Sequence, residues 1–243
     1  MTRACCRYLG TEMEISIRYN VPVTSDAVEI MHHITHINNT LSFPIQNGST
    51  AGKEVISRII TDLDTQGAMY TDTNGLHTLK RIRNHRDTWT LNSSEPISDN
   101  YYPINARAYL HGSTGASLGI ATDRSHGGAS LVDGQIEIMV QRALTQDDKR
   151  GVGEPLNEQY WLGDLSARFH VTLGAKNAVL QRTKTHHMQL SYPLLSFIGV
   201  DVPPAAAPLA PMISGLPDNV ELLSLNTQYE QVRRDCVATC AVC

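Results

Sequence analysis

The chain has 243 residues, of which 41% are apolar and 18% are charged, and its formal net charge is -4. This length and apolar content predict a globular protein with one large domain or two small ones. The chain lacks the basic excess typical of proteins that bind nucleic acid or anionic membranes, so neither is a predicted partner.

The first twenty residues contain no apolar core of a secretory signal, so we predict no signal peptide in this chain. The most apolar later stretch, residues 192–216, contains Asp201 and five prolines. These residues would leave backbone groups unsatisfied in lipid, so we predict a surface connector instead of a membrane span.

Apolar residues recur with a period of two along much of the chain, which predicts half-buried strands. Hairpin turns are predicted at Asn74–Gly75 and Asp133–Gly134. No long amphipathic helix is predicted, and the pattern indicates an all-β protein, an antiparallel β-sandwich whose strands have one wet face. The alternating apolar positions are Met13, Ile15, Ile17 and Tyr19; Ile104, Ala106, Ala108 and Leu110; Ile136, Ile138 and Val140; and Phe169, Val171 and Leu173.

Two groups of residues resemble metal ligands, but neither predicts a metal site. His32 and His36 have the spacing of a helical metal pair, without a third ligand or a flanking glutamate nearby. The three C-terminal cysteines lack a fourth partner at a recognisable spacing, so free thiols in a frayed tail are the preferred interpretation. Pairing between the two ends stays open for the whole set, which is Cys5, Cys6, Cys236, Cys240 and Cys243.

Three ordered blocks carry a more specific signal. They read "GKEVISRIITDLDTQGAMYTDTNG", "RIRNHRDTWTLNSSEPISDNYYPINARAYL" and "TDRSHGGASLVDGQIEIMVQRALTQDDKRGVGEPL". Together they resemble the C-terminal half of the lysosomal-type α-mannosidases of glycoside hydrolase family 38. The resemblance covers residues 53–156 strongly and continues weakly through residues 215–230.

The resemblance implies a fold, an activity and a partner. The matched blocks belong to a mutarotase-like β-supersandwich that follows an α/β barrel, and the barrel carries the nucleophile and a zinc ion. We therefore expect an incomplete sandwich that shapes or supports the active site of an α-mannosidase barrel, which hydrolyses terminal α-linked mannose from N-glycans. No cofactor is expected within this chain, which is predicted to be inactive alone. The alternative is a stand-alone carbohydrate-binding or interaction module.

The loop "TQDDKRGVG" supplies the candidate site residues, which are Arg142, Asp147, Asp148 and Arg150. In the family the matching loop packs against the barrel near the mannose pocket, so these residues are expected to contact substrate or to dock the domains. They are not predicted to be catalytic, because retaining hydrolysis needs two carboxyl groups about 5 Å apart and neighbouring side chains in an extended chain point apart. We expect this loop to follow a strand, residues 130–142, that begins after a bend at Gly127–Gly128.

Tyrosine side chains form a second candidate. Tyr101 and Tyr102 are predicted either to stack on a sugar ring or, preferably, to form a packed corner of the sandwich. Glycosylation sequons occur at Asn38, Asn47 and Asn92. By family resemblance the protein is expected in the lysosome or secretory pathway.

The predicted domains are residues 1–52, a leading strand with an atypical insertion; 53–230, the β-sandwich; and 231–243, a cysteine-containing tail. Residues 24–51 depart from the family pattern and are interpreted as a surface loop or an untrimmed intron. A truncated gene product is the hypothesis that these departures raise.

Overall fold

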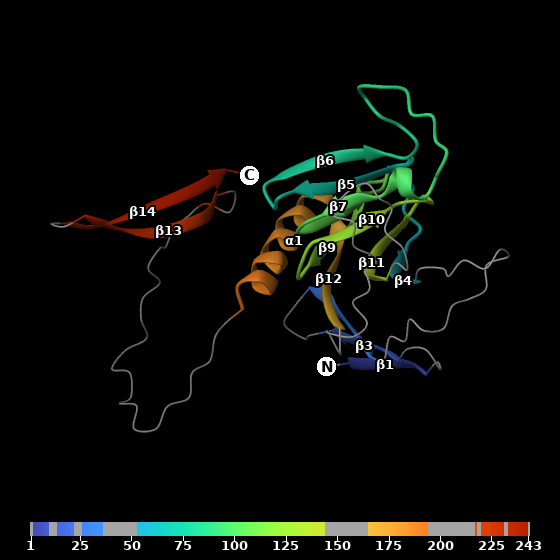
Figure 1. Cartoon of the computed structure of the whole chain (residues 1–243), viewed down its shortest axis with the longest axis horizontal. Coiled ribbons are helices and arrows are strands. Elements are labelled where there is room, and N and C mark those ends of the chain that lie inside the picture. The colour runs from blue at the N-terminus through green and yellow to red at the C-terminus, as the bar shows by residue number, and fades with distance from the viewer. Residues whose placement is uncertain are drawn as a thin grey trace. The chain divides into compact units, whose positions relative to one another are not determined.

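The computed structural model describes residues 2–9, 14–21, 26–35, 53–143, 165–193, 217, 220–230 and 233–242 (Figure 1). The chain divides into two compact units, residues 1–192 and 193–243. The second unit contains one antiparallel hairpin, formed by β13 (Val220–Glu230) and β14 (Arg233–Val242). The domain boundaries predicted at residues 52/53 and 230/231 stay predictions.

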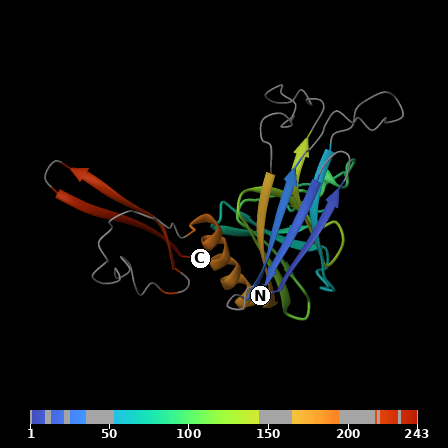
Figure 2. The same ribbon diagram turned by 90° about the horizontal axis from the view of Figure 1, so that it is seen from below.

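Two antiparallel sheets form the first unit, which confirms the predicted β-sandwich (Figures 1 and 2). In pairing order, the large sheet contains β1 (Thr2–Leu9), β2 (Glu14–Val21), β3 (Ala27–Thr35), β12 (Leu165–Ala175), β9 (Ala116–Thr122), β8 (Arg107–His111), β5 (Ala68–Thr73) and β6 (His77–Ile82). The small sheet contains β4 (Lys53–Ile60), β11 (Gln135–Ala143), β10 (His126–Ala129) and β7 (Tyr102–Ile104). A 3-10 turn, η1 (Ser98–Asn100), and one helix, α1 (Lys176–Ser191), complete the described elements.

The core lies between the two sheets, and most of the predicted apolar alternation points into it. The large sheet contributes Leu110, Ile120 and Phe169, and the small sheet contributes Ile104 and Ile136; all five are at most 1% exposed. Burying a side chain of this size contributes about 1.5–3 kcal/mol. At these five positions the alternation predicted correctly which side chains face the core.

Residues 27–35 contribute to this core, although they belong to the stretch that was interpreted as a surface loop or an untrimmed intron. They form β3, which pairs with β2 on one side and β12 on the other. Ile30 and Ile34 of this strand are buried. This part of the stretch is consequently a central strand of the large sheet, whereas residues 36–51 lie outside the described part of the chain.

Helix α1 was not predicted from the sequence, where only the absence of a long amphipathic helix was expected. It packs on β9, β12 and β8 of the large sheet. A Cβ at Gly119 of β9 would lie 2.0 Å from Oγ1 of Thr183, so glycine permits the close approach of the helix. Its buried side chains are Val179, Thr183 and His186, two of which are polar. A helix that buries so few apolar groups produces no apolar stripe for sequence periodicity to detect.

The helix also explains why the prediction of one wet face is wrong for part of the large sheet. Thr172 was predicted to be on the wet face of β12 but is fully buried, on the side opposite Val171. In β8, Tyr109 and Leu110 are adjacent and both buried, so this strand is covered on both faces. Leu173, predicted to face the core, is 61% exposed because the core cluster ends at Val171.

Among the described residues, no helix combines the length and apolar character needed to cross a membrane.

Candidate functional site

Arg142 lies near the end of β11 and is the one described member of the predicted loop site. Its Nε is 2.9 Å from Oε1 of Glu54 on the neighbouring strand β4, and both side chains are nearly half exposed. This ion pair joins two strands of the small sheet. Asp147, Asp148 and Arg150 lie outside the described residues, so their roles stay predictions.

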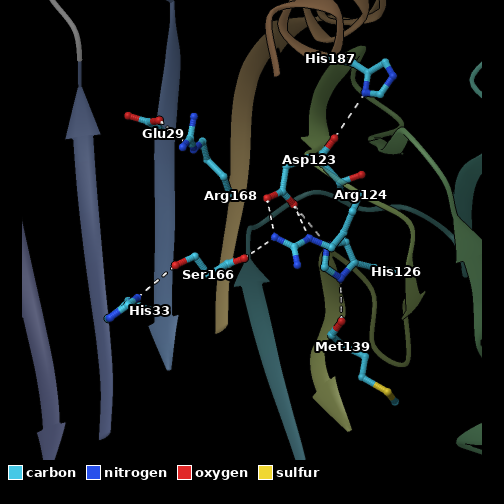
Figure 3. Close-up of polar contacts among 10 residues, drawn as sticks. Glu29, His33, Asp123, Arg124, His126, Met139, Ser166, Arg168 and His187 are labelled. Carbon is cyan, nitrogen blue, oxygen red and sulfur yellow. Dashed lines mark hydrogen bonds and ion pairs between the residues drawn. The ribbon is translucent and has the colours of Figure 1, made fainter. Parts of the chain in front are cut away.

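The segment "TDRSH", residues 122–126, joins β9 to β10 and forms a polar cluster that Figure 3 shows. Arg124 contacts both carboxylate oxygens of Asp123, with Nη2 lying 3.1 Å from Oδ2, and also donates to the backbone oxygen of Ser166. The Nδ1 of His126 donates to the backbone oxygen of Met139 at 2.9 Å. We call Asp123, Arg124, His126 and Ser166 the clasp.

The clasp connects the two sheets at one end of the sandwich. Met139 belongs to β11 of the small sheet, and Ser166 is the second residue of β12 in the large sheet. Residues 144–164, which include the predicted loop, join these two strands. The clasp therefore holds together the strands on which that segment begins and ends.

Asp123 is suited to holding this turn and not to donating a proton. Burial opposes its ionisation, but the contacts with His126 and Arg124 outweigh burial and keep the pKa of Asp123 below its ordinary value. Its Oδ1 lies 3.7 Å from Nε2 of His126, beyond hydrogen-bond distance. A carboxylate that stays ionised is a poor general acid, so the chemistry available to it is charge-assisted binding.

Further polar contacts extend the clasp across the large sheet (Figure 3). The hydroxyl of Ser166 contacts Nδ1 of His33 on β3 at 3.0 Å, and Arg168 lies 3.7 Å from Glu29. On the other side, Nδ1 of His187 in α1 is 3.3 Å from the backbone oxygen of Thr122. Polar contacts from β3 and α1 thus reach Ser166 of the clasp and Thr122, the last residue of β9.

The two glycines after the clasp correct another expectation. Gly127 and Gly128 were predicted to form a bend, but both lie within β10 and pair with β7. A Cβ at Gly128 would lie 2.4 Å from Cδ1 of Ile104 and 2.9 Å from the backbone oxygen of Glu137. The glycine is needed for close packing of the strand, which sequence cannot distinguish from a turn.

The two tyrosines form a packed corner, the preferred of the two predicted roles. The hydroxyl of Tyr101 donates to Oε1 of Glu137 at 2.6 Å, while Arg58 binds Oε2 of the same carboxylate. Burial, and then the hydrogen bond to Glu137, raise the pKa of Tyr101. The guanidinium carbons of Arg81 and Arg86 lie 4.6 Å and 5.1 Å from the centroid of the Tyr102 ring. Glu137 could not be singled out from the sequence, because its position between the buried Ile136 and Ile138 of β11 predicts an exposed side chain, whereas it is 5% exposed.

The other candidate residues have separate positions. Asn92 is exposed, whereas Asn38 and Asn47 lie outside the described residues. His32 is buried in strand β3 against the ring of Phe169, and His36 is not described. Within the described residues, no three His, Cys, Asp or Glu side chains are placed to hold a metal ion. These residues consequently do not fit a zinc ion.

The fold and the clasp define a β-sandwich domain with a braced end. A family model described as "Glycosyl hydrolases family 38 C-terminal domain" matches residues 6–150, which include β2, β3 and the clasp turn. The chain therefore belongs to this family.

Sequence comparison with two mammalian proteins agrees with this assignment. The chain is 54% identical over 116 residues to "Lysosomal alpha-mannosidase" of Bos taurus, which covers 48% of this chain and 12% of that protein. It is 43% identical over 192 residues to "Lysosomal alpha-mannosidase" of Felis catus, which covers 75% of this chain and 19% of the relative. The chain thus spans less than a fifth of the length of either relative.

A solved structure of an alpha-mannosidase from Enterococcus faecalis V583 superposes with a TM-score of 0.52 at 15% identity, covering 72% of this chain and 18% of that one. At this identity the likeness supports the fold alone.

Acidification is expected to destabilise the sandwich. Burial lowers the pKa of His32 and His170, and burial followed by the charge of Lys176 lowers the pKa of His111 from 6.5 to about 4. The unfolded chain therefore binds protons more readily, and the free energy of unfolding should fall as the pH drops from about 6.5 towards about 4. Urea denaturation across this range measures the effect.

The control is His111→Gln, whose stability should depend less on pH over this range because one titrating group is removed. A free energy of unfolding that stays constant or increases on acidification would contradict the prediction.

Proposed function

We propose that this chain is the C-terminal β-sandwich portion of an α-mannosidase, and that it shapes or supports the active site of a zinc-containing catalytic barrel outside these 243 residues. The substrate class proposed for the joined protein is terminal α-linked mannose of N-glycans, in the lysosome or secretory pathway. The observation that carries this proposal is the family match over residues 6–150.

The clasp gives a physical reason why this sandwich could support the active site of a neighbouring barrel. It braces the strands between which residues 144–164 run, and the charge-assisted hydrogen bonds of Arg124 favour a defined geometry there. A rigid base under that segment would let Asp147, Asp148 and Arg150 present one arrangement to a neighbouring barrel or to substrate. Rigid scaffolds that carry functional loops are a common design in enzymes.

The zinc ion is assigned to the barrel in this proposal, because the described residues do not fit it. Zinc would supply Lewis-acid chemistry there. The residues of this chain would bind and orient.

Complementation tests the proposal. The full chain alone is expected to release no product from a chromogenic α-mannoside, with or without added zinc, because a nucleophile and acid pair is needed. The same chain combined with a catalytic domain of the family, fused or co-expressed, should restore hydrolysis. Zinc-dependent turnover by the chain alone, or a catalytic domain whose activity is unaffected by this chain, would contradict it.

A matched pair of variants makes the complementation specific. Arg124→Ala removes the contacts that join Asp123 to Ser166. Arg182→Ala is the control, because it removes a comparably exposed arginine of α1, which pairs with Asp26. The first change is expected to lower the restored kcat/KM more than the second. Thermal denaturation of both variants separates loss of support from loss of folded protein.

A further inference from the structure

The long connection between β6 and β7 is rigidly closed at its base. We call residues 84–100 the Trp89 loop. Asn100, which is 3% exposed, donates to Oδ1 of Asn84 and to the backbone oxygen of Pro96, and its own Oδ1 accepts from the backbone of Asn84. Asn84 has a φ of 57°, a conformation that asparagine tolerates better than most residues. These contacts hold the two ends of the loop together.

Contacts inside the loop hold its course as well. Asp99 accepts from the hydroxyl of Ser93 at 2.7 Å, and Arg86 donates to the backbone oxygens of His85 and Asp99 and to the hydroxyl of Tyr102. Irregular connections of this length are uncommon in compact domains and are frequently functional when they are ordered. The loop's own side chains that hold it, those of Arg86, Ser93 and Asp99, are polar and lie outside the hydrophobic core.

One side of the loop, residues 84–91, surrounds an open cavity of about 450 Å³. Trp89 lines it and is 57% exposed. His85 and Asp87, which also line the cavity, lie 3.1 Å apart and are largely exposed. The loop thus presents a wide aromatic surface to solvent beside hydrogen-bond donors and acceptors.

We propose that this cavity binds a pyranose ring of a glycan, with Trp89 as the surface on which the ring stacks. A pyranose combines an apolar face with hydroxyl groups around its edge, which matches an indole flanked by Asp87 and His85. A phosphate or carboxylate ligand fits less well, because the guanidinium of Arg86 is already bound by the loop itself. The proposal rests on the proposed function only for the class of ligand, a glycan.

The ring can come from two sources. One is a separate oligosaccharide, and the other is a glycan attached to Asn92, which is exposed three residues beyond Trp89. Both sources offer the same chemistry to the indole. The experiment therefore uses the full chain made both in a host that does not attach N-glycans and in one that does.

Ligand-observed saturation-transfer NMR on the unglycosylated chain measures binding of α-mannopentaose, with sorbitol as an acyclic polyol control. We expect saturable, weak binding of the oligosaccharide and none of sorbitol. Trp89→Ala should weaken binding about tenfold or more, because the stacking surface is lost. The chain has two tryptophans, so Trp161→Phe leaves Trp89 as the only one. Titration of this variant with the oligosaccharide should change the Trp89 fluorescence and give the same dissociation constant as the NMR measurement.

The matched control is Ile97→Ala. Ile97 is in the same loop and is 61% exposed, but it is not among the residues around the cavity, so its loss should leave binding unchanged. Equal melting temperatures for the two alanine variants would show that both are folded. No oligosaccharide binding by the unglycosylated chain, or binding that Trp89→Ala leaves intact, would overturn the proposal.

The glycosylated chain then identifies the source. If the attached glycan occupies Trp89, the glycosylated chain should not bind added oligosaccharide and Asn92→Gln should restore binding. If the site serves a separate glycan, both forms should bind equally. Because these measurements need no hydrolysis, a failed complementation experiment would leave their outcome unchanged, and absence of sugar binding here would leave complementation unaffected.

Discussion

Asp72→Ala is expected to destabilise the sandwich by about 4 kcal/mol, because it removes one buried carboxylate that satisfies four backbone amides. Oδ1 of Asp72 accepts from the backbone amides of Asn105, Ala106 and Arg107, each at 2.9 Å, and Oδ2 accepts from that of Gly75 at 2.6 Å. The side chain is 1% exposed, so water cannot readily replace it. Urea denaturation monitored by circular dichroism measures the loss.

Two controls bracket this result. Asp72→Asn keeps the shape of the side chain and one acceptor oxygen, but replaces the other oxygen with an NH2 group. It should therefore lower the free energy of unfolding by less than the alanine variant does. Asp87→Ala removes a carboxylate that is 86% exposed and should change the free energy of unfolding by less than about 0.5 kcal/mol. If Asp72→Ala behaved like Asp87→Ala, the four hydrogen bonds would not contribute as argued.

Arg150→Ala is expected to lower kcat/KM about ten- to a hundredfold in the chain joined to a catalytic domain. The reason is that a charge-assisted contact to substrate or to a pocket-lining carboxylate contributes about 1.5–3 kcal/mol. The expectation follows from the family resemblance of the "TQDDKRG" loop, since this residue lies outside the described part of the chain. The measurement is steady-state hydrolysis of a chromogenic α-mannoside per folded molecule.

Melting temperature on the same preparation separates the two roles predicted for this loop. If the loop only docks the domains, Arg150→Ala should lower the melting temperature with kcat/KM nearly unchanged, and Asp148→Asn should behave in the same way. Arg142→Ala is a useful comparison, because this arginine pairs with Glu54 across the small sheet. Lost stability without lost specific activity would remove Arg150 from the substrate-proximal residues.

Sequence alone predicted the sandwich because alternation is a local property of each strand. Ile136 and Ile138 occupy alternate positions of β11 and both face the core. The turn at Asn74–Gly75 was also predictable, since both residues adopt the positive φ that the sequence indicated. Neither inference required knowledge of which strands are neighbours.

Helix α1 could not be predicted in this way. Its place depends on Gly119, 57 residues before Lys176, the first residue of the helix. The fit of Val179 and Thr183 over that glycine appears only when β9 and the helix are packed together. The clasp is similar. Asp123 and Arg124 are neighbours in the third block that carries the family resemblance, but the hydrogen bond from Arg124 to Ser166 joins residues 42 positions apart.

The sequence by itself determined the strand pattern, the family resemblance and the location of the candidate loop, because these depend on the order of residue types along the chain. Tertiary structure decided which polar residues matter together. Asp72 binds amides 33 to 35 residues away, Glu137 joins Arg58 to Tyr101, and Asn100 closes the loop that exposes Trp89. Hydrogen bonds between distant segments carry no local periodicity, so only the packed sandwich reveals them.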